Sequence, residues 1–296
     1  MSRKGTVLFA LMGAIWGFPY LLIKVSVRYL SPGTLVCART GLAAIILLPI
    51  AARRGQLRPL LGHWRPIVVY TVVELAVPWL LLSDAERRLS SSLSGLLVAA
   101  VPLIGAILVI FVGGDDRLDR RRLAGLLVGL VGVGVLLGFD VSSGDIASAG
   151  EVAAVAVGYA VGPMIAARQL RDVPAMGVVT ASLALTALAY LPWAAFHLPA
   201  RVPPGRVLAA VAALAVVCTA VAFVAFFALI AEVGPTRATV ITYINPAVAV
   251  TLGVAFLGES FGVSTAVGFA LILGGSYLAV FAARRSEPAN IQVAEP

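Results

Sequence analysis

Long runs of apolar residues alternate along this chain with short clusters of charged residues. The runs are continuously apolar and rich in Leu, Val, Ala and Gly, whereas a membrane β-strand shows only about ten residues of alternating polarity. About 20 apolar residues in a helix cross a bilayer core about 30 Å thick. We therefore predict an all-α membrane protein with ten transmembrane helices. The ten runs lie at approximately residues 6–23, 33–52, 66–82, 92–113, 122–138, 149–167, 174–195, 206–230, 236–257 and 263–283.

Composition and charge fit a protein that is surrounded by a lipid bilayer. Of the 296 residues, 60% are hydrophobic and 12% are charged, which is more apolar than a soluble domain requires. The net charge of +8 does not indicate a nucleic-acid partner, because the basic residues lie in the loops between the runs. With the N-terminus inside, 15 basic residues are cytoplasmic and six are outside, which follows the positive-inside rule. We expect a multi-pass protein of the cell (plasma or inner) membrane with both termini cytoplasmic.

The two halves of the chain repeat each other. The stretch "AERRLSSSLSGLLVAAVPLIGAILVIFVGGD" (85–115) resembles "AEVGPTRATVITYINPAVAVTLGVAFLGE" (231–259). Each has Ala-Glu, then a proline (Pro102 or Pro246), then a glycine and an acidic residue twelve residues later. Five spans per repeat reverse the direction of the second copy, and such inverted repeats build many secondary transporters. The predicted units are a first repeat at 6–138, a second repeat at 149–283 and a cytoplasmic tail at 284–296.

Several of these features together resemble a known family. They are "AIWG" in the first span (14–17), the proline and Gly-acid pairs of both repeats, a Gly-rich last span, and "VELAVPWLLLSDAERRLSSSLSGLLVAAVP" (73–102). The chain resembles the EamA type of the drug/metabolite transporter (DMT) superfamily over about residues 6–283. The resemblance implies a ten-helix carrier of small metabolites such as amino acids, without an ATPase domain. We expect export of amino-acid-like or other small organic solutes by alternating access, with no cofactor.

Glu74 is the clearest candidate for the site. It lies eight residues from either end of its predicted span, and a charge at the bilayer centre costs about 2.5 to 3.5 kcal/mol on insertion scales. Such residues face the bundle interior or a cavity. Three roles remain open: Glu74 carries a coupling proton, binds a cationic group of the substrate, or only ties helices together.

Arg39 lies six residues into its predicted span. Its long side chain can snorkel to the outer face, can form a salt bridge with Glu74 or Glu86, or can bind an anionic substrate group. Glu86 and Glu232 occupy matched positions in the two repeats. We expect both to lie near the N-terminal ends of the following helices, where the helix dipole favours a negative charge; a role in gating is the alternative.

Aromatic and amide side chains complete the candidate site. Trp16 and Tyr159 are matched in the first spans of the two repeats and are expected to approach each other. Asn245 answers Val101 in the repeat, so it either bonds to a carbonyl freed by Pro246 or points into a cavity between the halves. For the aromatic residues, plain packing is the alternative to lining a cavity. The predicted substrate-binding residues are Trp16, Tyr20, Arg39, Glu74, Trp79, Tyr159, Tyr243 and Asn245.

Prolines and glycines are frequent inside the predicted spans. Each proline removes a backbone hydrogen bond that a neighbouring group, a water or a cavity must satisfy. Glycines in the fifth and tenth spans predict close helix contacts, either within the fold or between the subunits of a homodimer. The intramembrane prolines are Pro19, Pro49, Pro78, Pro102, Pro163, Pro192 and Pro246.

The sequence lacks the motifs of several other membrane proteins. It has no Gly-x-x-x-x-Gly-Lys-Ser/Thr phosphate loop and no His-Glu-x-x-His motif, so an ATP-driven pump, a metalloprotease and a metal site are not expected. We expect no enzyme activity. Two classes remain: a secondary carrier, which the inverted repeat favours, and a membrane receptor or scaffold that binds a partner without transport.

Overall fold

The computed structural model describes residues 2–112, 120–140, 146–234 and 238–281. All the regular structure of these residues is helical. The predicted tail at 284–296 and the Gly114-Asp115 pair of the first repeat lie outside the described residues.

Seven helical segments are long and apolar enough to cross a membrane. They are Arg3–Ser26, Pro32–Arg53, Arg58–Arg88, Ser91–Leu108, Ile146–Gln169, Ala175–Phe196 and Gly205–Val233. Three shorter apolar helices are Leu123–Leu137, Ile241–Leu257 and Val263–Leu278. The prediction of an all-α membrane protein is therefore confirmed for the described residues.

Several of these segments consist of two or three helical pieces. In chain order the pieces are α1 (Arg3–Ile15), α2 (Phe18–Ser26), α3 (Pro32–Arg53), η1 (Arg58–His63), α4 (Trp64–Tyr70), η2 (Thr71–Ala76), α5 (Val77–Arg88), α6 (Ser91–Val98), α7 (Val101–Val112), α8 (Arg120–Asp140), α9 (Ile146–Gln169), α10 (Ala175–Phe196), α11 (Gly205–Ala215), η3 (Val216–Val221), α12 (Ala222–Val233), η4 (Thr239–Tyr243), α14 (Asn245–Leu257) and α15 (Val263–Phe281). Two of the short pieces, η2 and η3, are π-helices.

Prolines lie at four of the junctions between helical pieces. Four of the seven intramembrane prolines are the second residue of a helix that follows a break, namely Pro19, Pro78, Pro102 and Pro246. Proline suits the first turn of a helix because its missing N–H has no intrahelical acceptor there. The other three, Pro49, Pro163 and Pro192, lie inside α3, α9 and α10. The junctions therefore place helix ends inside the apolar segments, where their backbone groups need partners from neighbouring residues.

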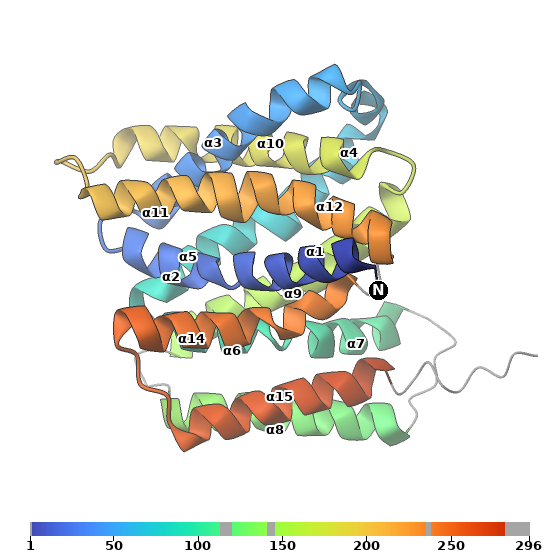
Figure 1. Cartoon of the computed structure of the whole chain (residues 1–296), viewed down its shortest axis with the longest axis vertical. Helices are drawn as coiled ribbons and strands as arrows, with labels where there is room; N and C mark the ends of the chain where they lie inside the picture. Colours follow the sequence, from blue (N-terminus) through green and yellow to red (C-terminus); the bar gives the residue numbers. More distant parts are fainter. Residues whose placement is uncertain (1, 113–119, 141–145, 235–237, 282–296) are drawn as a thin grey trace, which may run out of the picture.

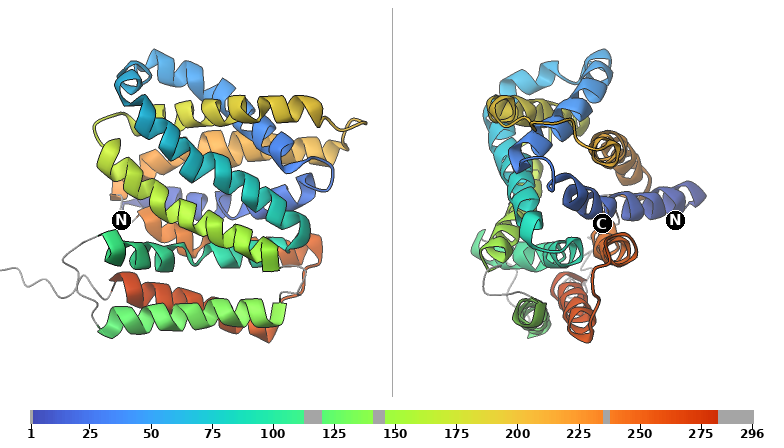
Figure 2. Two further views of the ribbon diagram at one scale, coloured as in Figure 1. Left: turned by 180° about the vertical axis from the view of Figure 1, so that it is seen from behind. Right: turned by 90° about the vertical axis from the view of Figure 1, so that its left-hand side faces the viewer.

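The helices lie side by side, with α3, α4 and α10 at one end of the bundle and α8 and α15 at the other (Figure 1). Elements from the two halves of the chain pack against each other: α3 against α10, α6 against α14, and α8 against α15. The first helix of each half packs against the third segment of the other, α1 against α12 and α9 against α5. α1 and α9 run in opposite directions (Figures 1 and 2).

Glycines allow the close approach of α8 and α15. A Cβ added at Gly132 would lie 2.8 Å from Gly268 O, and one added at Gly275 would lie 2.6 Å from Gly125 O. Such backbone contacts leave no room for a side chain, so these glycines serve a contact within the fold. Gly134 and Gly274 differ, because an added Cβ meets no described atom within 4 Å.

Candidate functional site

One π-helix interrupts the third segment of each half. η2 divides residues 58–88 and η3 divides residues 205–233. Glu74 is the fourth residue of η2, and Thr219 is the fourth residue of η3. A π-turn is rare and frequently marks a functional site, because it releases a backbone carbonyl from the regular ladder. Thr219 uses such a carbonyl, since its Oγ1 donates a hydrogen bond of 2.7 Å to Leu214 O.

Glu74 lies against a glycine surface of α9. Its Oε2 is buried and has no hydrogen-bond partner among the described residues. A Cβ added at Gly162 would overlap this oxygen, and one added at Gly158 would lie 2.7 Å from Pro78 Cγ. Both glycines of α9 therefore let the π-turn of η2 approach the helix closely. The arrangement leaves a carboxylate oxygen that can still accept a hydrogen bond or hold a proton.

Arg39 is buried in the centre of the bundle, with 8% of its surface exposed. Its Nε donates a 3.0 Å hydrogen bond to Thr219 Oγ1, and its Cζ lies 3.7 Å from the centroid of the Trp79 ring. This position does not fit snorkelling to the outer face. Within the described residues Arg39 also forms no ion pair with Glu74 or Glu86, so two of its three predicted roles are not seen.

Tyr159 brings the charged candidates into one region. It lies within electrostatic range of Glu74, Arg39 and Glu86 and is adjacent to the Trp79 side chain. Tyr20 is buried and lies within range of Tyr159, Arg39 and Glu86. The structure therefore brings together four of the eight predicted site residues, from α2, α3, α5 and α9, and a fifth, Glu74 of η2, is within electrostatic range of Tyr159. The four are Tyr20, Arg39, Trp79 and Tyr159.

Trp16 occupies a different aromatic environment from the one predicted. Its ring lies 4.6 Å from Phe226 and 6.0 Å from Phe223, measured between centroids. Trp16 and Tyr159 both pack against the same apolar core, but no ring contact joins them in the described part of the chain. The aromatic rings that contact Trp16 thus come from α12, and not from Tyr159, its counterpart in the repeat.

Asn245 ties two broken helices together. With its amide oriented to donate, Nδ2 lies 3.1 Å from Gly13 O in α1 and 3.0 Å from Ile241 O in η4. These bonds correspond to the first of its two predicted roles, which is to satisfy free carbonyls at a helix break. Tyr243 is partly buried at the end of η4.

Glu259 caps the N-terminus of α6 from the other half of the chain. Its Oε1 accepts from Ser91 N at 2.7 Å, and its Oε2 accepts from Ser92 N at 2.9 Å and Ser92 Oγ at 2.5 Å. Ser91 Oγ is a further donor, at 3.1 Å from Oε2. A carboxylate suits this position because the first N–H groups of a helix lack partners and carry partial positive charge.

Glu86 does not occupy the predicted place at a helix N-terminus. It lies near the C-terminal end of α5 with none of its surface exposed, and the role expected of it belongs to Glu259. Its counterpart Glu232 contacts residues at the start of α1: Ser2 Oγ donates to Oε1, and Lys4 Nζ lies 3.6 Å from Oε2. Glu232 therefore lies near a helix N-terminus, that of α1.

The family assignment rests on both halves of the chain. The EamA-like transporter family matches residues 3–138 and again residues 150–281. This chain belongs to that family. The resemblance noted from the sequence is therefore confirmed, and the protein belongs to a membrane transporter family rather than to an enzyme family.

Relatives of this EamA-like protein are also transporters by name. It is 29% identical over 255 residues to "Uncharacterized inner membrane transporter YedA" of Escherichia coli strain K12, covering 86% of this chain and 82% of that protein. It is 26% identical over 166 residues to "Probable amino-acid metabolite efflux pump" of Salmonella typhimurium strain LT2, covering 54% of this chain and 51% of the relative. A solved crystal structure shares the fold, with a TM-score of 0.69 at 24% identity, and covers 96% of this chain and 100% of its own. The EamA-like protein is accordingly a multi-pass protein of the plasma (inner) membrane.

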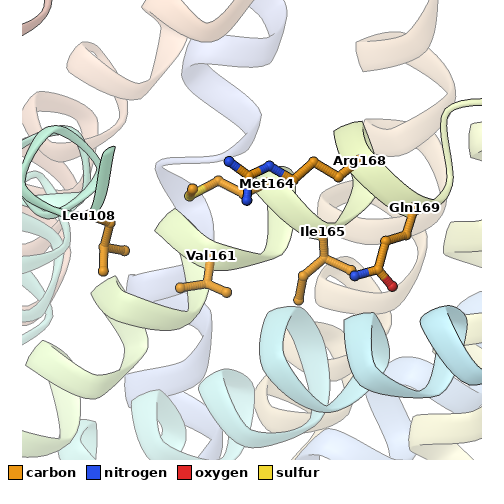
Figure 3. A pocket seen from close by; sticks show the side chains of 6 residues that line it. All are labelled: Leu108, Val161, Met164, Ile165, Arg168 and Gln169. Carbon is orange, nitrogen blue, oxygen red and sulfur yellow. The ribbon is translucent and has the colours of Figure 1, made fainter. Parts of the chain in front are cut away.

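A shallow pocket of the EamA-like protein lies away from the buried charges. It is formed between α7 and α9, near the end of α9, and Figure 3 shows the Arg168 side chain extending along its wall. None of the predicted site residues lines it. The lining residues are Leu108, Val161, Met164, Ile165, Arg168 and Gln169.

Sequence reasoning missed three polar residues of the EamA-like protein. Thr219, Lys24 and Glu259 all contact the other half of the chain or a helix end. Glu259 had a signal, since it is the acid of the repeated Gly-acid pair. No sequence signal indicated Thr219. It is the fourth residue of η3, as Glu74 is of η2, but the apolar pattern does not show where a π-helix occurs.

Proposed function

We propose that this chain is a secondary carrier that exports amino-acid-like solutes by alternating access. In this proposal ten spans form two inverted five-helix repeats, at 6–138 and 149–283, and both termini are cytoplasmic. The family membership, the opposite directions of α1 and α9, and the cross-packing of the two halves support this arrangement. Inverted repeats commonly place the substrate site at their interface near the membrane midplane.

Two buried groups of opposite charge carry the proposal. Within the described residues Arg39 makes its hydrogen bond through Nε, which leaves both terminal nitrogens of the guanidinium for a ligand. Glu74 Oε2 is buried and has no donor in the part of the chain that the structure describes. An α-amino acid offers the complementary pair, because its carboxylate fits a guanidinium fork and its ammonium fits a carboxylate. Tyr159 lies within electrostatic range of both groups.

Each charged group belongs to, or is hydrogen-bonded to, a segment interrupted by a π-helix. Glu74 belongs to η2, and Arg39 is bonded to Thr219 of η3. A ligand that binds both groups therefore links the third segments of the two repeats. Rocking of one repeat against the other would expose this site first to one side of the membrane and then to the other. The aromatic side chains Trp79, Tyr159 and Tyr20 would surround the apolar part of the solute.

The test is flux of radiolabelled amino acids in proteoliposomes that contain the full chain. Wild-type protein is expected to give saturable flux that is stimulated by unlabelled solute on the opposite side. Arg39→Lys keeps the charge but loses the fork, so we expect flux of amino acids to fall about tenfold or more, as for the loss of one charge-assisted hydrogen bond. Arg171→Lys is the matched control, because Arg171 is exposed and pairs with Asp172.

Glu74→Gln separates recognition of the amine from recognition of the carboxylate. We expect this variant to lose flux of amino acids while it retains more flux of the corresponding keto acids, which lack the ammonium group. Equal loss for both solute classes would contradict a role for Glu74 in binding the amine. An absence of flux for every amino acid tested in the wild-type protein would refute the carrier and favour a receptor or scaffold.

A further inference from the structure

A second buried carboxyl group lies outside the pair proposed to bind substrate. Glu86 belongs to α5 and is completely buried. Among residues 2–112, 120–140, 146–234 and 238–281, neither carboxylate oxygen has a partner at normal hydrogen-bond geometry, although the Lys24 backbone lies close enough to interact with the carboxyl group. An ionised carboxylate taken from water into such a place loses its hydration without replacement, which is among the most costly arrangements in a protein.

Lys24 acts electrostatically on Glu86 and also bonds to backbone carbonyls. Lys24 of α2 donates one hydrogen bond of 2.7 Å to Glu86 O and another of 2.7 Å to Leu89 O. These carbonyls belong to the last turn of α5, where lysine satisfies groups that have no intrahelical donor. Lys24 therefore offsets the negative end of the helix dipole as well as part of any charge on Glu86.

A second acidic side chain lies on the other side of the same junction. Glu259 is held as an acceptor by Ser91 and Ser92 at the start of α6, and it acts electrostatically on Glu86. Its hydrogen bonds come from four N–H and O–H donors, so the negative charge of this site is located on Glu259. A second negative charge on Glu86 would be repelled by it.

We propose that Glu86 is a proton-binding site at the junction of α5 and α6, distinct from Glu74. The proton neutralises a carboxyl group that has no donor at normal geometry among the described residues, lies near a helix C-terminus and is within electrostatic range of a second carboxyl group. The role rests on the proposed carrier function, in which the proton comes from water on one side when this junction opens and is released to water on the other. Glu74 then recognises the solute, and Glu86 couples its movement to the proton.

The Glu259 contacts provide the link to conformational change. They join the segment between α14 and α15 to α6, and thus the second half of the chain to the first. The Glu259 contact must be released if the repeats separate at this end, which the proposed topology places outside, whereas the Lys24 contact joins two helices of the first half and can persist. Opening then exposes Glu86 to water and allows it to exchange its proton.

The groups around Glu86 define what else titrates near it. On α2 they are Lys24 and Tyr20, on α3 Arg39, on α9 Tyr159, and beyond α14 Glu259. On α5 itself, Asp84, Arg87 and Arg88 form ion pairs among themselves, and Arg88 also pairs with Glu151 of α9. Of these, only Glu86 is a fully buried acid, so its proton should give a separate signal.

The decisive measurement is infrared difference spectroscopy on the full chain in lipid, comparing wild type with Glu86→Gln. We expect a band of a protonated carboxyl group in the wild type that is absent from the variant and shifts in Glu86→Asp. Glu232→Gln is the matched control, because Glu232 is the counterpart of Glu86 but is partly exposed and bonded to Ser2 and Lys4. This control should leave the band unchanged.

Transport measurements connect the site to function and keep the two proposals separate. Flux by the wild type should depend on a pH gradient, whereas flux by Glu86→Gln should continue without that dependence. If the spectra of Glu86→Gln and Glu86→Asp show the same protonated-carboxyl bands as the wild type, the inference is overturned, whatever the flux. If the band is present but no amino acid is carried, the proposed function fails while proton binding by Glu86 stands.

Discussion

The contact between α8 and α15 gives the sharpest prediction for stability. A Cβ placed on Gly275 would lie 2.6 Å from Gly125 O and 2.6 Å from Gly129 Cα, whereas ordinary contact begins at 3.4 Å. All the atoms met are backbone atoms, which cannot rotate away. Gly275→Ala therefore requires the two helices to separate by nearly 1 Å at this level. Gly274 is the matched control, because an added Cβ there meets no described atom within 4 Å.

The magnitude follows from packing. A radial gap of about 0.5–1 Å already forfeits a quarter to a half of each dispersion contact, and overpacking of a tight interior costs about 1–3 kcal/mol. We expect Gly275→Ala to lower the free energy of unfolding by about 2–3 kcal/mol, since the contact is between backbones. Gly274→Ala should be neutral or stabilising by up to about 1 kcal/mol, because alanine is the better helix former.

The assay is thermal denaturation of the purified full chain in one detergent, followed by circular dichroism. At about 2–4 °C per kcal/mol, Gly275→Ala should melt roughly 5–10 °C below the wild type, and Gly274→Ala should not melt below it. Equal melting temperatures for the two variants would refute the reasoning, because both exchange a glycine for an alanine in consecutive positions of one helix and differ only in what the new methyl group meets.

Three further variants test the contacts around the proposed site. Glu259→Gln replaces one accepting oxygen by an NH₂ group, so the melting temperature should fall by an amount equivalent to about 2 kcal/mol. Ser92→Ala should lower stability less in the Glu259→Gln background than in the wild type. Strictly additive losses of stability would show that the two residues are not coupled. Gly162→Ala should displace the Glu74 carboxyl group and lower amino-acid flux with little loss of expression, whereas Gly150→Ala on the same helix, where a Cβ meets no described atom within 4 Å, should behave as wild type. Asn245→Val removes donors to two carbonyls and should reduce thermal stability by about 1–3 kcal/mol while solute preference stays unchanged; altered preference would instead place Asn245 in the binding site.

The apolar pattern alone was sufficient for the helical architecture. A backbone in lipid must satisfy its own hydrogen bonds, so long apolar runs have few alternatives to a helix. The prolines alone did not determine where the helices break, since Pro19, Pro78, Pro102 and Pro246 are each the second residue of a new piece, whereas the other three lie inside α3, α9 and α10. The cost of a charge in lipid was enough to single out Glu74 and Arg39.

The partners of those residues were decided by the tertiary structure. Arg39 could snorkel, pair with an acid or remain available to a ligand, and only the packing of α3 against η3 placed its Nε on Thr219. Likewise the repeat matched Trp16 with Tyr159, but the crossing of α1 and α12 put Phe226 against Trp16. Glu86 and Glu259 are both acidic residues near predicted helix ends. Long-range packing determined that Glu259 caps α6 and that Glu86 is buried with no donor at normal geometry among the described residues. Spacing along a chain determines which face of a helix a side chain occupies, whereas its contacts depend on which helix from the other half covers that face.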